Sequence, residues 1–119
     1  MQLITDELKE TFKQDFPLYS PDGKGKSAKV VAKYFMPAGR GTWYALEGQE
    51  QEDGDFLFFG YISIFDGEFG YWTLSQLEEI EIPVQIEGIG TGLVKIERDL
   101  YFPVAEMTLA EALKGDGIE

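Results

Sequence analysis

An Asp66-Gly67 pair stands between two strand-like runs, and this arrangement indicates the class of fold more firmly than any other part of the sequence. The run before the pair, residues 56–65, is apolar on both faces, which is typical of a strand with a neighbour on each side. Asp-Gly is a strong signal for the tight turn of a β-hairpin, and residues 68–72 form the second strand. The sequence therefore predicts an antiparallel hairpin inside a sheet, with Gly60 marking a bulge or a close backbone approach.

Two further strands are predicted before this hairpin and one after it. Residues 29–36 are rich in β-branched and aromatic side chains, Pro37 ends the run, and a short connection leads to a second strand at residues 42–47. A last strand is expected near residues 93–96, after a glycine-rich connection. Strands that are joined by short turns pair antiparallel, so the pattern favours an antiparallel sheet of about five strands.

Three short helices are predicted from threonine N-caps, two of which have a Gln or Glu at capping-box spacing. The capping residues are Thr5, Thr73 with Gln76, and Thr108 with Glu111. Pro17 ends the first helix, Gly115 follows the last, and Pro21-Asp22-Gly23 predicts a turn. The fold class is therefore α+β, a single domain over residues 1–119 with short helices at the N-terminus, before the last strand and at the C-terminus.

The charge of the chain is divided unevenly. Residues 1–40 hold seven Lys or Arg and five Asp or Glu, whereas residues 41–119 hold three and seventeen. A surface this acidic repels phosphate backbones and anionic lipid and attracts basic partners. The sequence has no secretory signal and no run of about 20 apolar residues, so we expect a soluble, cytoplasmic protein without direct contact to nucleic acid or membrane.

Histidine and cysteine are both absent. Their absence removes the usual general base at neutral pH, the usual neutral metal ligand, and every thiolate or disulfide site. Catalysis would have to use carboxylates, Lys, Tyr or a metal held by oxygen atoms. We therefore expect no catalytic residue, no metal site and no cofactor.

Three other patterns have an ordinary structural interpretation. The glycines of Gly88-Ile89-Gly90-Thr91-Gly92 are not followed by a helix, so we expect a turn and not a phosphate-binding loop. The acidic run at residues 48–55 lacks the ligand spacing of a calcium loop and is expected to be a solvated loop. The aromatic side chains of residues 43–72 are expected to form mostly core, with one or two on an open sheet face as a contact patch.

The segment Glu97-Arg98-Asp99 is a candidate binding site. Arg98 is one of three cations in residues 41–119, and it stands between two acids at the end of a predicted strand. A guanidinium group holds carboxylates in two-point geometry, so the preferred interpretation is a salt-bridge clasp between neighbouring strands. The alternative is a ligand pocket in which Trp43 and Tyr71 join Glu97 and Arg98.

Several segments carry a resemblance to a known family. They are Leu3-Ile4-Thr5-Asp6-Glu7-Leu8, Lys33, Phe35, Pro37, Thr42-Trp43, Phe59-Gly60, Glu68-Phe69-Gly70-Tyr71-Trp72-Thr73-Leu74 with Leu77-Glu78, and Glu97-Arg98-Asp99-Leu100-Tyr101-Phe102. Over nearly its whole length the chain resembles a bacterial family called domain of unknown function 2958, and differs near residues 24–29 and in a longer stretch at residues 81–92. The resemblance implies a small single domain, often encoded on plasmids and other mobile elements, with no assigned activity and no catalytic residues to transfer.

These observations favour a non-enzymatic, acidic accessory protein of a bacterial mobile element that acts by protein–protein contact. A sharper form of this hypothesis is a DNA mimic, whose carboxylates after Arg40 imitate phosphates and occupy a basic, nucleic-acid-binding protein. The alternative is a small-molecule-binding domain or an enzyme that works with paired carboxylates. The two hypotheses can be separated, because only the second requires a pocket that holds an Arg, two acids and an aromatic wall.

Overall fold

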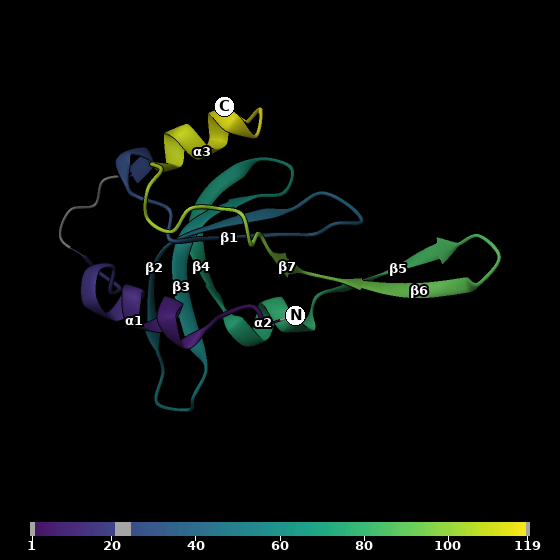
Figure 1. Cartoon of the computed structure of the whole chain (residues 1–119), viewed down its shortest axis with the longest axis horizontal. Coiled ribbons are helices and arrows are strands. Elements are labelled where there is room, and N and C mark those ends of the chain that lie inside the picture. The colour runs from purple at the N-terminus through teal and green to yellow at the C-terminus, as the bar shows by residue number, and fades with distance from the viewer. Residues whose placement is uncertain (1, 21–24, 119) are drawn as a thin grey trace.

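The computed structural model describes residues 2–20 and 25–118, and these residues form three α-helices and seven β-strands (Figure 1). The helices are α1 (Asp6–Asp15), α2 (Leu74–Glu79) and α3 (Leu109–Gly115), and a short 3-10 turn, η1 (Gly25–Ser27), precedes the first strand. The strands are β1 (Ala32–Phe35), β2 (Thr42–Glu50), β3 (Phe56–Ser63), β4 (Gly67–Thr73), β5 (Glu81–Ile86), β6 (Gly90–Lys95) and β7 (Glu97–Arg98). The predicted α+β class is confirmed. The turn predicted at Pro21-Asp22-Gly23 lies outside the described residues.

Five strands form one antiparallel sheet in the order β4-β3-β2-β1-β7, which confirms the prediction of about five strands. The helices take the predicted positions, since α1 lies near the N-terminus, α2 precedes the last strands and α3 lies near the C-terminus. The predicted β3–β4 hairpin is present, but its turn differs in detail. Gly67 is the first residue of β4, where a Cβ atom would overlap the Tyr61 ring, and the connection consists of residues 64–66.

The two faces of the sheet are covered by different helices, with α1 and α2 on one side and α3 on the other (Figure 1). The α1 face holds the larger core, which includes Leu8, Phe12, Phe58, Trp72 and Leu77. The α3 face holds a smaller core, which includes Val30, Tyr44, Leu46, Tyr61, Leu109 and Leu113. Strand β4 contributes no described residue to the smaller core, so the α3 face is open at that edge of the sheet.

The close backbone approach that the sequence offers as one alternative for Gly60 is present, and the bulge lies in β2, the strand opposite. The register of β2 with β3 shifts between Ala45 and Glu47. A Cβ atom on Gly60 would collide with the Tyr44 carbonyl oxygen and with the Trp72 ring. The glycine therefore permits the close approach of the two strands at the bulge.

The last part of the chain differs from the prediction, because residues 93–96 do not join the main sheet. They overlap β6, which pairs with β5 in a separate two-stranded ribbon. The sequence does not predict β5, since Pro83 interrupts it, but a two-stranded ribbon tolerates proline because one edge of each strand is unpaired. The predicted glycine-rich turn connects these two strands, with Gly88 and Gly90 at positive φ. The fifth strand of the main sheet is instead β7, which pairs with β1.

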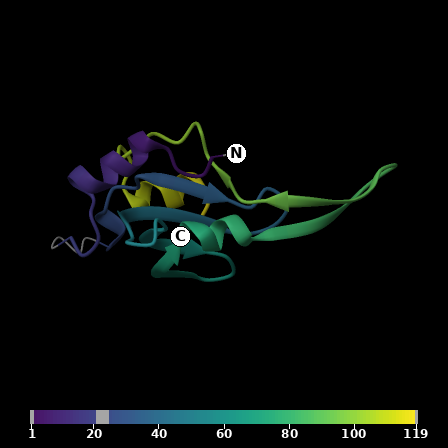
Figure 2. The same ribbon diagram turned by 90° about the horizontal axis from the view of Figure 1, so that it is seen from below.

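The β5–β6 ribbon projects from the body of the protein (Figures 1 and 2) and extends the molecule to 52 × 35 × 23 Å. Ile82 and Val94 pack against the larger core, whereas Ile86, Ile89 and Leu93 are exposed. No helix in the described ranges combines the length and the apolar character that crossing a bilayer requires.

A substitution at Tyr34 tests the effect of a polar atom that the larger core buries. Among the described residues, the Tyr34 hydroxyl and Trp72 Nε1 are buried and form no hydrogen bond. Burial raises the pKa of Tyr34 and outweighs the opposing effect of the Arg98 charge, so the hydroxyl is neutral. Tyr34→Phe is expected to raise the free energy of unfolding by about 1 kcal/mol in urea denaturation, because it removes a desolvation penalty.

The matched control for Tyr34→Phe is Tyr44→Phe, which removes a hydroxyl that does have a partner. Tyr44 donates a hydrogen bond to Asp116, and the loss of a hydrogen bond to a charged group costs roughly 1.5–3 kcal/mol. The two variants should therefore change stability in opposite directions. A destabilised Tyr34→Phe protein would show that this hydroxyl does have a partner in solution.

Candidate functional site

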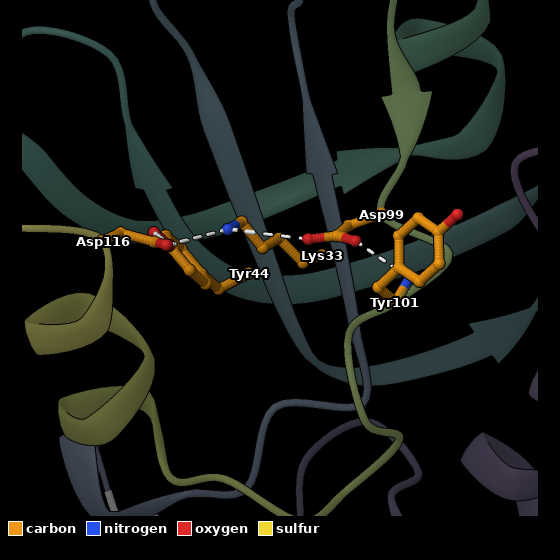
Figure 3. A network of polar contacts seen from close by, with 5 residues as sticks. All are labelled: Lys33, Tyr44, Asp99, Tyr101 and Asp116. Atoms are coloured by element: carbon orange, nitrogen blue, oxygen red, sulfur yellow. Dashed lines mark hydrogen bonds and ion pairs between the residues drawn. The ribbon is translucent and has the colours of Figure 1, made fainter.

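Lys33 stands at the centre of a polar cluster on the α3 face (Figure 3). Its Nζ lies 2.8 Å from Asp116 Oδ2 and 3.8 Å from Asp99 Oδ2. Tyr44 Oη donates a hydrogen bond of 2.5 Å to Asp116 Oδ2, and the Tyr101 backbone N–H donates one of 3.0 Å to Asp99 Oδ1. This group, which we call the lysine cluster, connects β1, β2, the segment after β7 and the C-terminal end of α3.

The lysine cluster is largely shielded from solvent. The Lys33 side chain is 15% exposed, and its Nζ lies 6.0 Å from the ring centroids of Tyr44 and Phe102. Burial, followed by the hydrogen bond to Asp116, raises the pKa of Tyr44, so its hydroxyl remains a donor. An ammonium group that is paired with two carboxylates has no lone pair for attack on a substrate. The arrangement therefore suits the attachment of α3 to the sheet better than covalent chemistry.

The predicted segment Glu97-Arg98-Asp99 lies beside the lysine cluster. Arg98 is paired with Tyr34 across β7 and β1, and its Nε donates to the Gln2 carbonyl oxygen at 3.3 Å. Asp99 forms the ion pair with Lys33, and its backbone N–H donates to the Lys33 carbonyl oxygen at 2.9 Å. Glu97 is exposed. The segment is therefore bound to a neighbouring strand, and Asp99 supplies the ion pair with that strand.

Trp43 and Tyr71 do not join this segment in a pocket. Trp43 is buried in the larger core, and Tyr71 lies on β4, at the opposite edge of the sheet from β7. Adjacent strands are about 4.8 Å apart, so the four spacings separate the two edges by roughly 19 Å. Trp43, Tyr71, Glu97 and Arg98 therefore do not line one pocket, because Tyr71 lies at the far edge of the sheet and Trp43 is buried in the core.

Two of the open cavities on the described surface lie away from Trp43, Tyr71 and Arg98. One, of about 520 Å³, lies between α1 and β2 and is lined by Lys9, Lys13 and Glu50 among others. The other, of about 530 Å³, lies at the base of the ribbon and includes Glu97. Neither of these cavities includes Trp43, Tyr71 or Arg98.

An open group of aromatic side chains occupies the part of the α3 face near β4. The group consists of Tyr19, Phe59, Phe69 and Tyr71, and we call it the aromatic patch. The ring centroid of Tyr71 lies 5.0 Å from that of Phe59 and 6.3 Å from that of Tyr19, and Phe69 lies 6.1 Å from Phe59. The exposed fractions are 74% for Tyr19, 41% for Phe69 and 51% for Tyr71. These rings contact one another and are still available to a partner.

The alternation of side chains along the strands places the aromatic patch on one face. Phe59 is paired with Tyr71 across β3 and β4, and Phe69 lies two residues before Tyr71. Tyr19 reaches the patch from the segment after α1. Its φ of 63° is uncommon for a bulky residue, and its backbone N–H donates to Glu47 Oε1 at 3.0 Å. A strained backbone position is thus held in place at the edge of the patch.

Three residues of the aromatic patch, Phe59, Phe69 and Tyr71, belong to an acidic part of the chain that has no cations. Between Arg40 and Lys95 there are eleven Asp or Glu and no Lys or Arg, and this stretch includes β2, β3 and β4. The sequence predicts one or two aromatic residues on an open face without locating them. The signal that could have located them is the spacing of Phe69 and Tyr71, which lie two residues apart on a strand without polar side chains between them.

Asp55, at the end of the acidic loop, binds the start of α2. Strand β2 continues to Glu50, so the loop predicted at residues 48–55 is shortened to residues 51–55. The Asp55 carboxylate accepts hydrogen bonds from the Ser75 hydroxyl at 2.6 Å and from the Ser75 backbone N–H at 3.1 Å. The hydrogen bond from the Ser75 side chain is the main cause of a lowered pKa at Asp55. This carboxylate therefore has a structural role.

Asp55→Ala is expected to lower the free energy of unfolding at neutral pH by about 1 kcal/mol. Because the pKa of Asp55 is lower in the folded state than in the unfolded state, its contribution is present above the unfolded pKa and is lost as the pH falls through the folded pKa. In urea denaturation at a series of pH values, the difference from wild type should shrink below about pH 4. Glu52→Ala, at an exposed position in the same loop, is the control. A defect of Asp55→Ala that persisted in acid would contradict this role of the carboxylate.

A five-stranded antiparallel sheet with helices on both faces, a projecting ribbon and an open aromatic patch defines a small α+β protein. A family model described as a protein of unknown function (DUF2958) matches residues 3–114. The chain therefore belongs to this family, which confirms the resemblance found in the sequence. Comparison with curated proteins and with solved structures gives no match.

Proposed function

We propose that this protein is non-enzymatic and acts in the cytoplasm by binding a basic protein partner through the aromatic patch. The observation that carries the proposal is the group of half-exposed rings on β3 and β4, within a stretch that has no Lys or Arg. Aromatic side chains are enriched at the centres of protein interfaces. The eleven carboxylates of the same stretch add attraction for a basic partner and increase its association rate.

Two features support binding over catalysis. The chain has no histidine or cysteine, and Lys33 is occupied by its ion pairs with Asp99 and Asp116. The small-molecule alternative relied on a shared pocket for Trp43, Tyr71 and Arg98, and these residues lie apart. A protein surface is therefore the better-supported kind of site.

Binding of a basic protein partner is preferred to the narrower hypothesis of DNA mimicry. A phosphate mimic needs its carboxylates along one face of the protein. Here the helical acids after Arg40 occur in α2 on one face of the sheet and in α3 on the other. A role as an accessory protein of a mobile element is part of the same proposal and depends on the family resemblance.

The proposal is tested by cross-linked affinity capture from bacterial cytosol with the wild-type protein and with a Phe69→Ser, Tyr71→Ser double variant. A partner captured by the wild type is then purified and titrated against both proteins. Loss of an aromatic hot spot costs about 2 kcal/mol or more, so the double variant should bind at least roughly 30-fold more weakly. Binding should also weaken as salt is added, because the attraction is partly electrostatic.

The control is Tyr101→Ser, which removes an aromatic ring that is 96% exposed and lies outside the patch. This variant should bind the partner as the wild type does. Equal affinity of the wild type and the double variant for every captured protein would refute the proposal. A capture with no specific partner would also count against it and would return attention to small ligands.

A further inference from the structure

Strand β4 forms one edge of the main sheet, and we propose that it accepts an extended basic peptide as a sixth strand. Arg or Lys side chains of this peptide would lie on Phe69 and Tyr71. The inference rests on the proposed function and specifies how the partner binds. Main-chain hydrogen bonds to the edge of the sheet supply affinity in this mode, and side-chain contacts supply specificity.

The outer edge of β4 is long, and no strand within the described ranges pairs with it. β4 has seven residues, and its inner edge pairs with β3 over its whole length without a register shift. Natural sheets protect such edges with Lys, Pro, a bulge or a very short strand. β4 contains no Lys or Pro, whereas β7 at the other edge has two residues. β4 is therefore the edge at which a foreign strand can be added.

The side chains of β4 fit a basic peptide. Phe69 and Tyr71 lie on one face, so an added strand would place every second side chain beside their rings. A guanidinium or ammonium group within about 6 Å of an aromatic centroid is attracted to the ring. The protein already makes this contact on the same face, since Lys33 Nζ lies 6.0 Å from the centroids of Tyr44 and Phe102.

Charge favours a basic peptide over a second copy of this chain. The chain has a net charge of −12, Asp66 directly precedes β4, and Glu68 is its second residue. Pairing of β4 with β4 of a second copy would bring like charges onto adjacent strands, which destabilises the pairing. A cationic strand would meet no Lys or Arg on β3, β4 or α2.

The probe for this inference is a fluorescein-labelled peptide of about eight residues, long enough to span the seven-residue strand, in which Arg and Thr alternate. Its affinity is measured by fluorescence anisotropy and compared with that of a peptide of the same composition whose Arg residues are clustered at one end. The alternating peptide should bind about tenfold more tightly, because only its arginines match the spacing of Phe69 and Tyr71.

Two further peptides test the main-chain contacts with the wild-type protein alone. One is N-methylated at odd residues and the other at even residues, so that each loses half of its N–H donors. In strand addition only one set faces β4, so one peptide should lose about tenfold or more in affinity and the other should bind nearly as well as the parent. Hydrogen exchange of residues 67–73 should slow when the parent peptide binds.

Equal losses for the two methylated peptides, or no binding of the alternating peptide, would overturn strand addition. The proposed function would survive that result if the captured partner still depended on Phe69 and Tyr71 in the affinity measurement. Strand addition would also be overturned if sedimentation showed a dimer in which residues 67–73 are protected without peptide, because a second copy would then occupy the edge.

Discussion

Gly60→Ala is expected to lower the free energy of unfolding by roughly 3–5 kcal/mol. The added Cβ atom would collide with the Tyr44 carbonyl oxygen, which is part of the backbone at the β2 bulge and cannot turn away as a side chain can. It would also press on the Trp72 ring, which is buried in the larger core. Urea denaturation followed by tryptophan fluorescence measures the loss, and low soluble yield would accompany it.

Gly70→Ala is the matched control for this substitution. Gly70 is paired with Gly60 across β3 and β4, but its added Cβ atom would lie 3.6 Å from Ile62 Cδ1, an ordinary contact. Glycine is unfavourable inside a strand, so this variant should be neutral or more stable by up to about 1 kcal/mol. Similar losses for the two variants would show that the close approach at the bulge is not the cause.

Lys33→Met is expected to have the second-largest effect, a loss of roughly 2–3 kcal/mol. The substitution keeps most of the apolar stem but leaves the Asp99 and Asp116 carboxylates without the cation that both contact. The loss is smaller than for a fully buried pair, because these carboxylates are 27% and 30% exposed. Since Asp116 caps α3, hydrogen exchange in α3 should quicken more than in β3.

Lys95→Met provides the comparison for Lys33→Met. Lys95 lies 4.0 Å from Glu81 in the ribbon, and both side chains are well exposed. Exposed ion pairs contribute about 0.2–1 kcal/mol, so this change should be small. If Lys33→Met cost no more than Lys95→Met, the lysine cluster would not be what attaches α3 to the sheet.

The helices that begin at capping residues can be predicted from the sequence, because the capping hydrogen bonds join residues three positions apart. The Thr73 side chain accepts a hydrogen bond from the Gln76 backbone N–H, and the Gln76 side chain accepts one from the Thr73 backbone N–H. Thr108 and Glu111 form the same pair of hydrogen bonds at the start of α3. The strand β5 is not predicted, because Pro83 argues against a strand that has neighbours on both sides. Only the tertiary fold shows that β5 has one neighbour, β6, and an unpaired edge that can hold a proline.

The candidate site is harder to predict for the same reason. Tyr61 and Tyr71 stand in the same aromatic-rich part of the sequence, yet Tyr61 is 8% exposed and Tyr71 is 51% exposed. The difference depends on where α3 lies, more than thirty residues later in the chain. Similarly, the proximity of Asp99 to Lys33 follows from the pairing of β7 with β1, which neither segment encodes alone.

The inequality of the two sheet edges limits how far molecules can assemble. A fibril grows only when each added molecule exposes an unpaired strand edge with which the next molecule can pair. Here one end of the sheet is a seven-residue strand, and the other is a two-residue strand followed by the segment bound to Lys33. A union at the long edge therefore leaves no second long edge in the main sheet for a third molecule, so growth through the main sheet should stop at two molecules.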